Sequence, residues 1–182
     1  MFHRKPASLP ERVGFFLVPQ FAMLSFASAL EPLRSANRLS GRALYSWHIL
    51  SKDGAPVLAS NGIPVVPEAG IEQAPALDAL VVCAGIDAHL YEDRAVFAWL
   101  RRMARRPIEI GAISLGPYVL ARAGLLDGYR CTLHWENLSG FTEAFPELEV
   151  TSELFEIDRD RFTCSGGIAG LDLMLQLIGR QH

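Results

Sequence analysis

The sequence predicts an α/β fold, a mostly parallel β-sheet with helices on both of its faces. Apolar runs without alternation, such as 13–18 and 79–83, are typical of strands buried on both faces. Helical patterns separate these runs along the chain, which is the order expected of strand–helix–strand units. The chain has 182 residues and half of them are hydrophobic, so one domain with a substantial core is expected.

The expected elements follow in chain order. The first strand leads to a helix at about 23–39, and Gly41 is its natural end because glycine adopts a left-handed backbone without strain. A strand at 45–50 comes next, and Ser60-Asn61-Gly62 predicts a hairpin between 55–59 and 63–66. The remaining expected elements are a strand at 79–83, a helix at 92–105, a strand at 108–113, a helix from Pro117 to about Gly124, a short strand at 130–133, a helix at 136–144, short strands at 149–151, 154–158 and 162–164, and a final helix at 168–178.

Composition narrows the function classes. The net charge of −3 provides no strong field for nucleic acid, and no apolar run reaches the length of a bilayer span, so no membrane partner is expected. Three cysteines far apart form no CxxC pair, which indicates neither a metal site nor a disulfide framework. A reducing cytoplasm is the simplest setting. Residues 1–11 are polar and are expected to form a flexible arm, followed by the domain itself at 12–182.

The most informative segment is 108–136. Its apolar run ends at Ser114, and Leu115 and the following glycine open a helical stretch. A strand, a sharp turn and a helix present one side chain at the carboxyl end of a parallel strand, where ligands bind in such folds. The N–H groups that open a helix can also receive an anion or a carboxylate. His134 follows twenty residues later, beside Trp135 and Glu136. A hydroxyl, a histidine and a carboxylate fit either a hydrolytic site or a ligand pocket.

Three blocks carry a family resemblance: AISLGPYVLARAGLLDGYRCTLHWE at 112–136, TCSGGIAGLDLMLQLIG at 163–179 and VGFFLVPQFAMLSFASALEPLRSANRLSG at 13–41. Together they resemble the PfpI/ThiJ-like, class I glutamine amidotransferase-like domain. The branch they resemble is the N-terminal ligand-sensing domain of AraC-family transcriptional regulators, especially those of choline, betaine, carnitine or arginine catabolism.

The resemblance implies a flavodoxin-like three-layer sandwich. It also implies a helix-turn-helix DNA-binding domain after residue 182, so DNA is expected to be bound only through that domain. A homodimer is expected because such regulators read paired half-sites.

The resemblance also indicates whether the chain is catalytic. Ser114 matches the family's elbow position, which is usually Cys in the enzymes and is variable in the regulators. The enzymes also carry an acid near the end of the first strand, where Ser25 stands here, and residues 21–30 contain no Asp or Glu. A non-catalytic, cofactor-free sensor of a small effector is therefore expected. The alternative is an enzyme of the superfamily, a hydrolase, hydratase or glyoxalase-like catalyst that uses Ser114 and His134.

The expected ligand is a small amino-acid-like or quaternary-amine zwitterion. Gly85 and Leu115 are expected to offer N–H donors to its carboxylate, and Trp135 and Glu136 to attract its cation. Two alternatives remain open: Trp135 as a core residue with a solvated Glu136, and Gly85 as a plain turn. Asp87 and His89 are expected at the rim. The predicted ligand-binding residues are Phe21, Gly85, Ile86, Ser114, Leu115, His134, Trp135 and Glu136.

Overall fold

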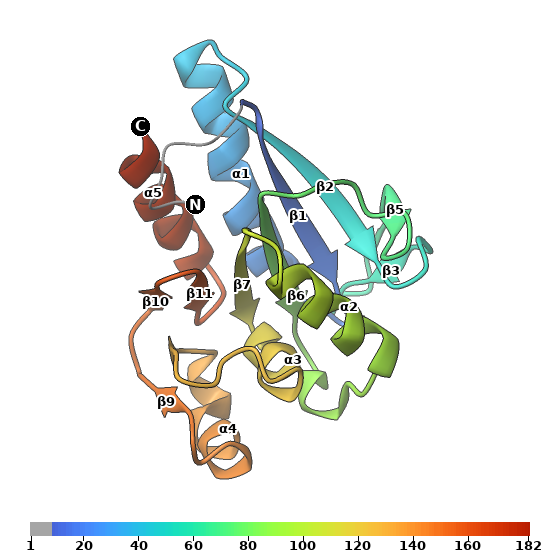
Figure 1. Ribbon diagram of the computed structural model, residues 1–182, viewed down its shortest axis with the longest axis vertical. Helices are drawn as coiled ribbons and strands as arrows, with labels where there is room; N and C mark the ends of the chain where they lie inside the picture. Colours follow the sequence, from blue (N-terminus) through green and yellow to red (C-terminus); the bar gives the residue numbers. More distant parts are fainter. Residues whose placement is uncertain (1–8) are drawn as a thin grey trace.

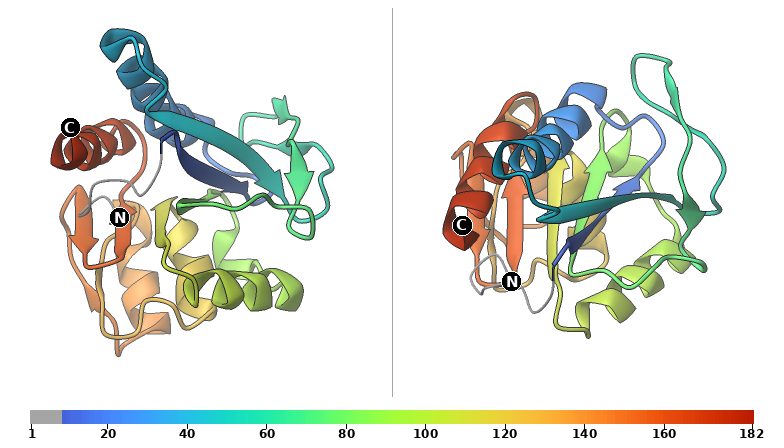
Figure 2. Two further views of the ribbon diagram at one scale, coloured as in Figure 1. Left: turned by 45° about the horizontal axis from the view of Figure 1, so that its top comes forward. Right: turned by 90° about the horizontal axis from the view of Figure 1, so that it is seen from above.

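The computed structural model describes residues 9–182, and these form a central sheet between two layers of helices (Figures 1 and 2). The helices are α1 (Met23–Ser40), α2 (Arg94–Ala104), α3 (Gly116–Arg122), α4 (Leu138–Ala144) and α5 (Ala169–Gln181), with 3-10 turns η1 (Ala88–Leu90) and η2 (Trp135–Asn137). The strands are β1 (Glu11–Leu17), β2 (Tyr45–Ser51), β3 (Val57–Leu58), β4 (Pro64–Val65), β5 (Ala69–Gly70), β6 (Ala79–Ala84), β7 (Glu109–Ser114), β8 (Arg130–Cys131), β9 (Glu149–Val150), β10 (Phe155–Asp158) and β11 (Arg161–Cys164).

The main sheet has the strand order β10-β11-β7-β6-β1-β2-β5. Its neighbouring strands are parallel, except for the antiparallel pair β10–β11. The predicted α/β class with a mostly parallel sheet is confirmed. Strands β1, β6 and β7 lie side by side, so their carboxyl ends meet at one edge of the sheet, which is where open sheets of this kind bind ligands.

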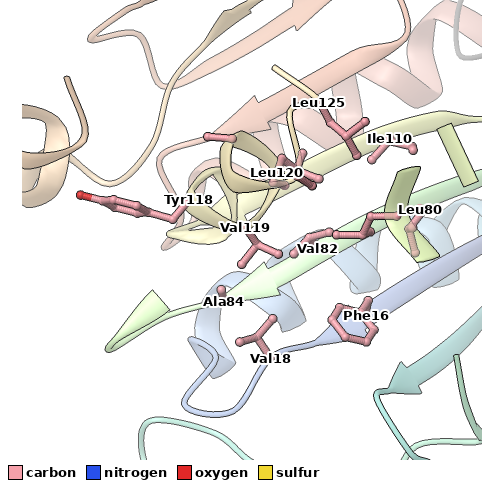
Figure 3. Close-up of a cluster of buried hydrophobic side chains, with 14 of the residues drawn as sticks. Phe16, Val18, Leu80, Val82, Ala84, Ile110, Tyr118, Val119, Leu120 and Leu125 are labelled. Atoms are coloured by element: carbon pink, nitrogen blue, oxygen red, sulfur yellow. The ribbon is translucent and has the colours of Figure 1, made fainter. Parts of the chain in front are cut away.

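Each central strand contributes to two hydrophobic cores because successive side chains point to opposite faces of the sheet. Phe16 and Val82 belong to the core under α2 and α3 (Figure 3). In this core, Phe16 packs on Trp99 with ring centroids 5.3 Å apart. Phe15 and Val81 belong to the core under α1 and α5. Figure 2 shows these two helix pairs on opposite sides of the sheet. Burial on both faces explains why the strands read as unbroken apolar runs.

Most predicted elements lie within two residues of their observed bounds. Gly41 ends α1 with φ 64°, as expected, and β3 and β4 form the predicted hairpin. Helix α2 begins later than predicted because the Asp93 carboxylate accepts hydrogen bonds from the Ala95 and Val96 N–H groups and so caps it. The stretch 136–144 divides into η2 and α4, and the two-residue strand β5 was not expected.

The predicted boundary between arm and domain needs one correction. Residues 1–8 lie outside the described part of the chain, but Glu11 opens β1 and is fully buried rather than part of an arm. Gln181 Nε2, at the end of α5, donates to Glu11 Oε2 at 2.7 Å, and the Tyr45 hydroxyl donates to Gln181 Oε1 at 2.5 Å. From the sequence, a charged residue at the start of a strand is expected to face solvent. The buried partners of Glu11 come from distant parts of the chain and are brought to it only by the fold.

Glu11 predicts a pH-dependent stability. Burial raises the pKa of its carboxyl, and the hydrogen bond from Gln181 offsets only part of this. The fold therefore prefers the protonated Glu11 carboxyl. The contribution of this group to the free energy of unfolding is complete below the usual pKa of 4.5, and it is lost as pH rises through the higher pKa of the folded state. We expect the wild-type chain to lose stability relative to Glu11→Gln as pH rises above 4.5 in urea titrations. Glu31→Gln is the control, since Arg34 lowers the pKa of Glu31 and reverses the trend. Parallel pH profiles for wild type and Glu11→Gln would contradict this account.

Candidate functional site

Ser114 ends β7 in a backbone conformation that side chains rarely adopt. Its φ is 58°, in the left-handed region, and α3 starts two residues later. The strand–turn–helix elbow expected from the sequence is therefore present. The residue is 5% exposed, and its carbonyl oxygen accepts a hydrogen bond from the His134 N–H at 3.2 Å. This bond holds the 130–137 segment against the elbow, so His134 and Glu136 reach the same cavity as Ser114.

The strained backbone of Ser114 gives a stability prediction. A left-handed conformation costs a residue with a Cβ roughly 1–2 kcal/mol, and glycine is free of that cost although it orders more backbone on folding. We expect Ser114→Gly to be more stable than Ser114→Ala by about 1 kcal/mol in denaturant titrations. The same pair at Ser46, within the extended strand β2, should show the reverse order. Equal stabilities at position 114 would show that the turn carries no strain.

A cavity of about 330 Å³ lies at the carboxyl ends of β6 and β7. Its walls come from the elbow, from the turn after β6, from the start of α1, from the β3–β4 hairpin and from the segment around η2. We call it the Ser114 cavity. The lining residues are Ala22, Ser60, Gly85, Ile86, Asp87, His89, Ser114, Leu115, His134, Glu136 and Asn137.

Six of the predicted ligand-binding residues line the cavity, together with both predicted rim residues, Asp87 and His89. Phe21 does not line it: the residue is fully buried and bridges to Ala59 and Gly85 behind the cavity wall. Trp135 does not line it either, since its side chain is 70% exposed beside the mouth. This exposure excludes the alternative that Trp135 is a core residue.

His134 contacts the side chains of both Trp135 and Glu136 in the segment around η2. Its Nδ1 lies 3.6 Å from Glu136 Oε2, and its ring stacks on Trp135 with centroids 5.8 Å apart and planes 29° apart. A carboxylate and an exposed indole therefore flank one imidazole at the cavity mouth. Within residues 9–182, no hydrogen bond joins the Ser114 hydroxyl to His134.

Ser25 stands beside the elbow, where the family resemblance places an acid in the enzymes. A Cβ added at Gly166 would lie 2.7 Å from Ser114 Cβ and 2.9 Å from Ser25 Oγ, so one glycine separates the two serines. Ser25 Oγ is occupied by the Gly167 N–H, which donates to it at 2.8 Å. A hydroxyl engaged in this way supplies no negative charge to activate a nucleophile at position 114.

The other nucleophiles are poorly placed for chemistry. All three cysteines are buried, as expected for Cys83 and Cys164, and burial raises the pKa of the Cys164 thiol to about 11. Among residues 9–182, no group of three or more His, Cys, Asp or Glu side chains is arranged to hold a metal ion. In the same part of the chain, no helix is both long and apolar enough to cross a membrane.

Three lining residues were not predicted from the sequence: Ala22, Ser60 and Asn137. Ser60 belongs to the predicted hairpin, and the hairpin reaches the cavity because the Ser60 N–H donates to the Phe21 carbonyl at 2.9 Å. No local pattern signals such a long-range contact. Asn137 could have been found, since it directly follows the predicted residue Glu136.

Known proteins that are similar to this chain include both a regulator and an enzyme. The chain is 50% identical over 173 residues to the HTH-type transcriptional regulator GbdR of Pseudomonas aeruginosa, an alignment that covers 95% of this chain and 47% of GbdR. It is 30% identical to the isonitrile hydratase of Pseudomonas putida, over 91% of this chain and 70% of the enzyme. The chain thus spans about half the length of GbdR.

A similar solved structure is also that of a transcriptional regulator. The crystal structure of an AraC family transcriptional regulator from Pseudomonas putida superposes with a TM-score of 0.84 and 32% identity, over 95% of this chain and 93% of that one. The sequence model of the DJ-1/PfpI family matches residues 11–179, from the first residue of β1 to near the end of α5. This chain belongs to the DJ-1/PfpI family.

Proposed function

We propose that this chain is the effector-binding domain of an AraC-type transcriptional regulator and binds a small zwitterion in the Ser114 cavity without converting it. The observation that carries the proposal is the pair of serines at the elbow, with Ser25 in place of an acid next to Ser114. The 50% identity to the transcriptional regulator GbdR over 95% of this chain supports the proposal. In the whole protein, a cytoplasmic homodimer would bind DNA through a helix-turn-helix domain.

The cavity suits an amino-acid-like or quaternary-amine ligand. Its volume of about 330 Å³ falls within the range of roughly 300–1,000 Å³ of small-molecule sites. The ligand carboxylate would lie toward the backbone of Gly85 and Leu115, which both line the cavity. The cation would lie toward Glu136, with the Trp135 indole beside the mouth, because carboxylates and aromatic faces both attract ammonium groups.

An enzyme of the same family is the second candidate function, and one observation favours it. Glu136 lies 3.6 Å from His134 Nδ1 and could orient the imidazole as a base. Ser114 would then be the nucleophile, and the positive φ of the elbow would present its hydroxyl. The isonitrile hydratase shows that relatives of this kind can catalyse reactions.

A turnover assay separates the two functions. We expect no hydrolysis of aryl esters or amides, and no consumption of methylglyoxal, above the rate of the Ser114→Ala variant. The physical reason is the uncharged, already hydrogen-bonded Ser25 at the position where a nucleophile would need an acid. A rate that disappears in both Ser114→Ala and His134→Gln, while these variants keep the wild-type unfolding curve, would establish catalysis and overturn the sensor function.

A further inference from the structure

A second cavity, of about 480 Å³, lies at the carboxyl end of β2 and is larger than the Ser114 cavity. Buried side chains form its floor, among them Leu17 and Val57. Pro19, Pro56 and the Tyr91 ring add apolar walls. A hollow of this size with mainly apolar walls and a few polar groups is typical of a small-molecule site.

The two cavities are separate because a stretch of backbone divides them. The Gln20 N–H donates to the Leu58 carbonyl and the Ser60 N–H donates to the Phe21 carbonyl, each at 2.9 Å. Gln20 and Leu58 line the second cavity, whereas Ala22 and Ser60 line the first. No residue lines both, so the second cavity is not an extension of the proposed effector site.

Three charged side chains set the electrostatics of the second cavity: Lys52, Asp53 and Asp93. Lys52 Nζ lies 2.5 Å from Asp93 Oδ2, and this partner raises the pKa of the Lys52 ammonium. The Lys52–Asp93 pair is neutral as a whole, and the charge of Asp53 leaves the cavity with a net charge of −1. An anionic ligand would therefore meet a paired lysine and an additional carboxylate.

Asp53 has an oxygen available to a ligand. Its Oδ1 accepts the Ala55 N–H at 3.0 Å, and within the described part of the chain no hydrogen bond engages Oδ2. Asp93 is less available, because its Oδ1 caps α2 and its Oδ2 pairs with Lys52. A cation that enters the cavity would thus be attracted mainly by Asp53, with Tyr91 as the aromatic wall.

We propose that this second cavity is a binding site for a small organic amine, with its ammonium group on Asp53 and its apolar body against Tyr91, Pro56 and Leu17. The two sites differ in ligand class: the proposed effector site takes a zwitterion, whereas the second cavity takes a cation with an apolar body and no carboxylate. It stands whether or not the Ser114 cavity binds a zwitterion, because the two share no lining residue.

An NMR titration of the 182-residue chain tests the proposal with three probes of similar shape: benzylammonium, benzyl alcohol and benzoate. We expect benzylammonium to shift the amide signals of Val57, Leu58 and Tyr91, with benzoate the weakest of the three. Asp53→Asn should weaken benzylammonium by about two- to fivefold, as expected for an exposed charge pair, and should spare benzyl alcohol. Asn at this position keeps an Oδ1 acceptor for the Ala55 N–H, so the turn is retained.

Asp87→Asn is the matched control in the Ser114 cavity, and it should leave these shifts unchanged. The proposal is overturned if benzylammonium shifts only signals of Ser114-cavity residues, or if benzoate binds the second cavity as tightly. It is also overturned if Asp53→Asn binds all three probes like the wild-type chain. The probe series on the wild-type chain decides the matter even where a variant folds poorly.

Discussion

Replacing Gly85 by alanine is expected to lower the free energy of unfolding by about 1–3 kcal/mol, the usual cost of overpacking a filled site, and to weaken effector binding. A Cβ at this position would lie 2.3 Å from the Gln20 carbonyl oxygen and 2.8 Å from the Ala22 nitrogen. Both are backbone atoms, so the strand end and the start of α1 must move apart. Gly85 also lines the Ser114 cavity, and this movement changes the shape of the site.

Gly179→Ala is the control for this prediction. A Cβ there meets nothing within 4 Å, and alanine favours a helix over glycine by up to about 1 kcal/mol. We therefore expect chemical denaturation to show Gly179→Ala at or above the wild-type stability and Gly85→Ala well below it. Similar stabilities for the two variants would mean that the contact between the β6 turn and the start of α1 is looser than the structure shows.

Replacing Trp135 by alanine is expected to weaken the binding of quaternary amines by about 0.5–1 kcal/mol, the usual strength of a cation–π contact at an exposed site. The side chain is 70% exposed and stacks on His134, so its loss should leave the unfolding curve almost unchanged. Trp135→Leu keeps an apolar side chain and removes the aromatic face, so it should behave like Trp135→Ala toward quaternary amines.

Glu136→Gln separates charge from shape at the same mouth. We expect it to weaken cationic ligands and to spare neutral ones of equal size, measured by thermal shift over a range of ligand concentrations. If Trp135→Ala and Glu136→Gln both bind quaternary amines like the wild-type chain, the cation does not lie at η2, and the proposed orientation of the ligand is wrong.

The sequence predicted the part of the site that is built from neighbouring residues. The elbow at Ser114 follows from a buried apolar run and the Gly116-Pro117 pair two residues after Ser114, because that order ends a strand and starts a helix. The same holds for the turn at Gly85, which follows an unbroken apolar strand. Local chemistry of this kind fixes where each strand ends, and the parallel pairing of β6 with β7 then brings the two ends together.

Contacts between distant segments could not be predicted in the same way. The local sequence places Glu11 in a polar arm, whereas its buried partner, Gln181, lies at the opposite end of the chain. Trp135 was predicted to line the pocket, and a short 3-10 turn places it at the mouth instead, since its neighbours His134 and Glu136 take the inward positions. In a turn of this kind, one residue of difference decides whether a side chain faces the cavity or the solvent.

Calorimetric titration of the 182-residue chain with the zwitterions carnitine and glycine betaine, and with arginine, which carries a guanidinium besides its zwitterionic head, tests the central claim most directly. The account predicts saturable binding of at least one of these with a stoichiometry of one per chain, stronger than that of analogues of the same size that lack the cationic group. At a hundredfold excess of ligand over Kd, binding should stabilise the fold by about 2.7 kcal/mol. Glu136→Gln should reduce the preference for ligands with a cationic group over analogues that lack it. Binding only of compounds that lack a cationic group would contradict the account.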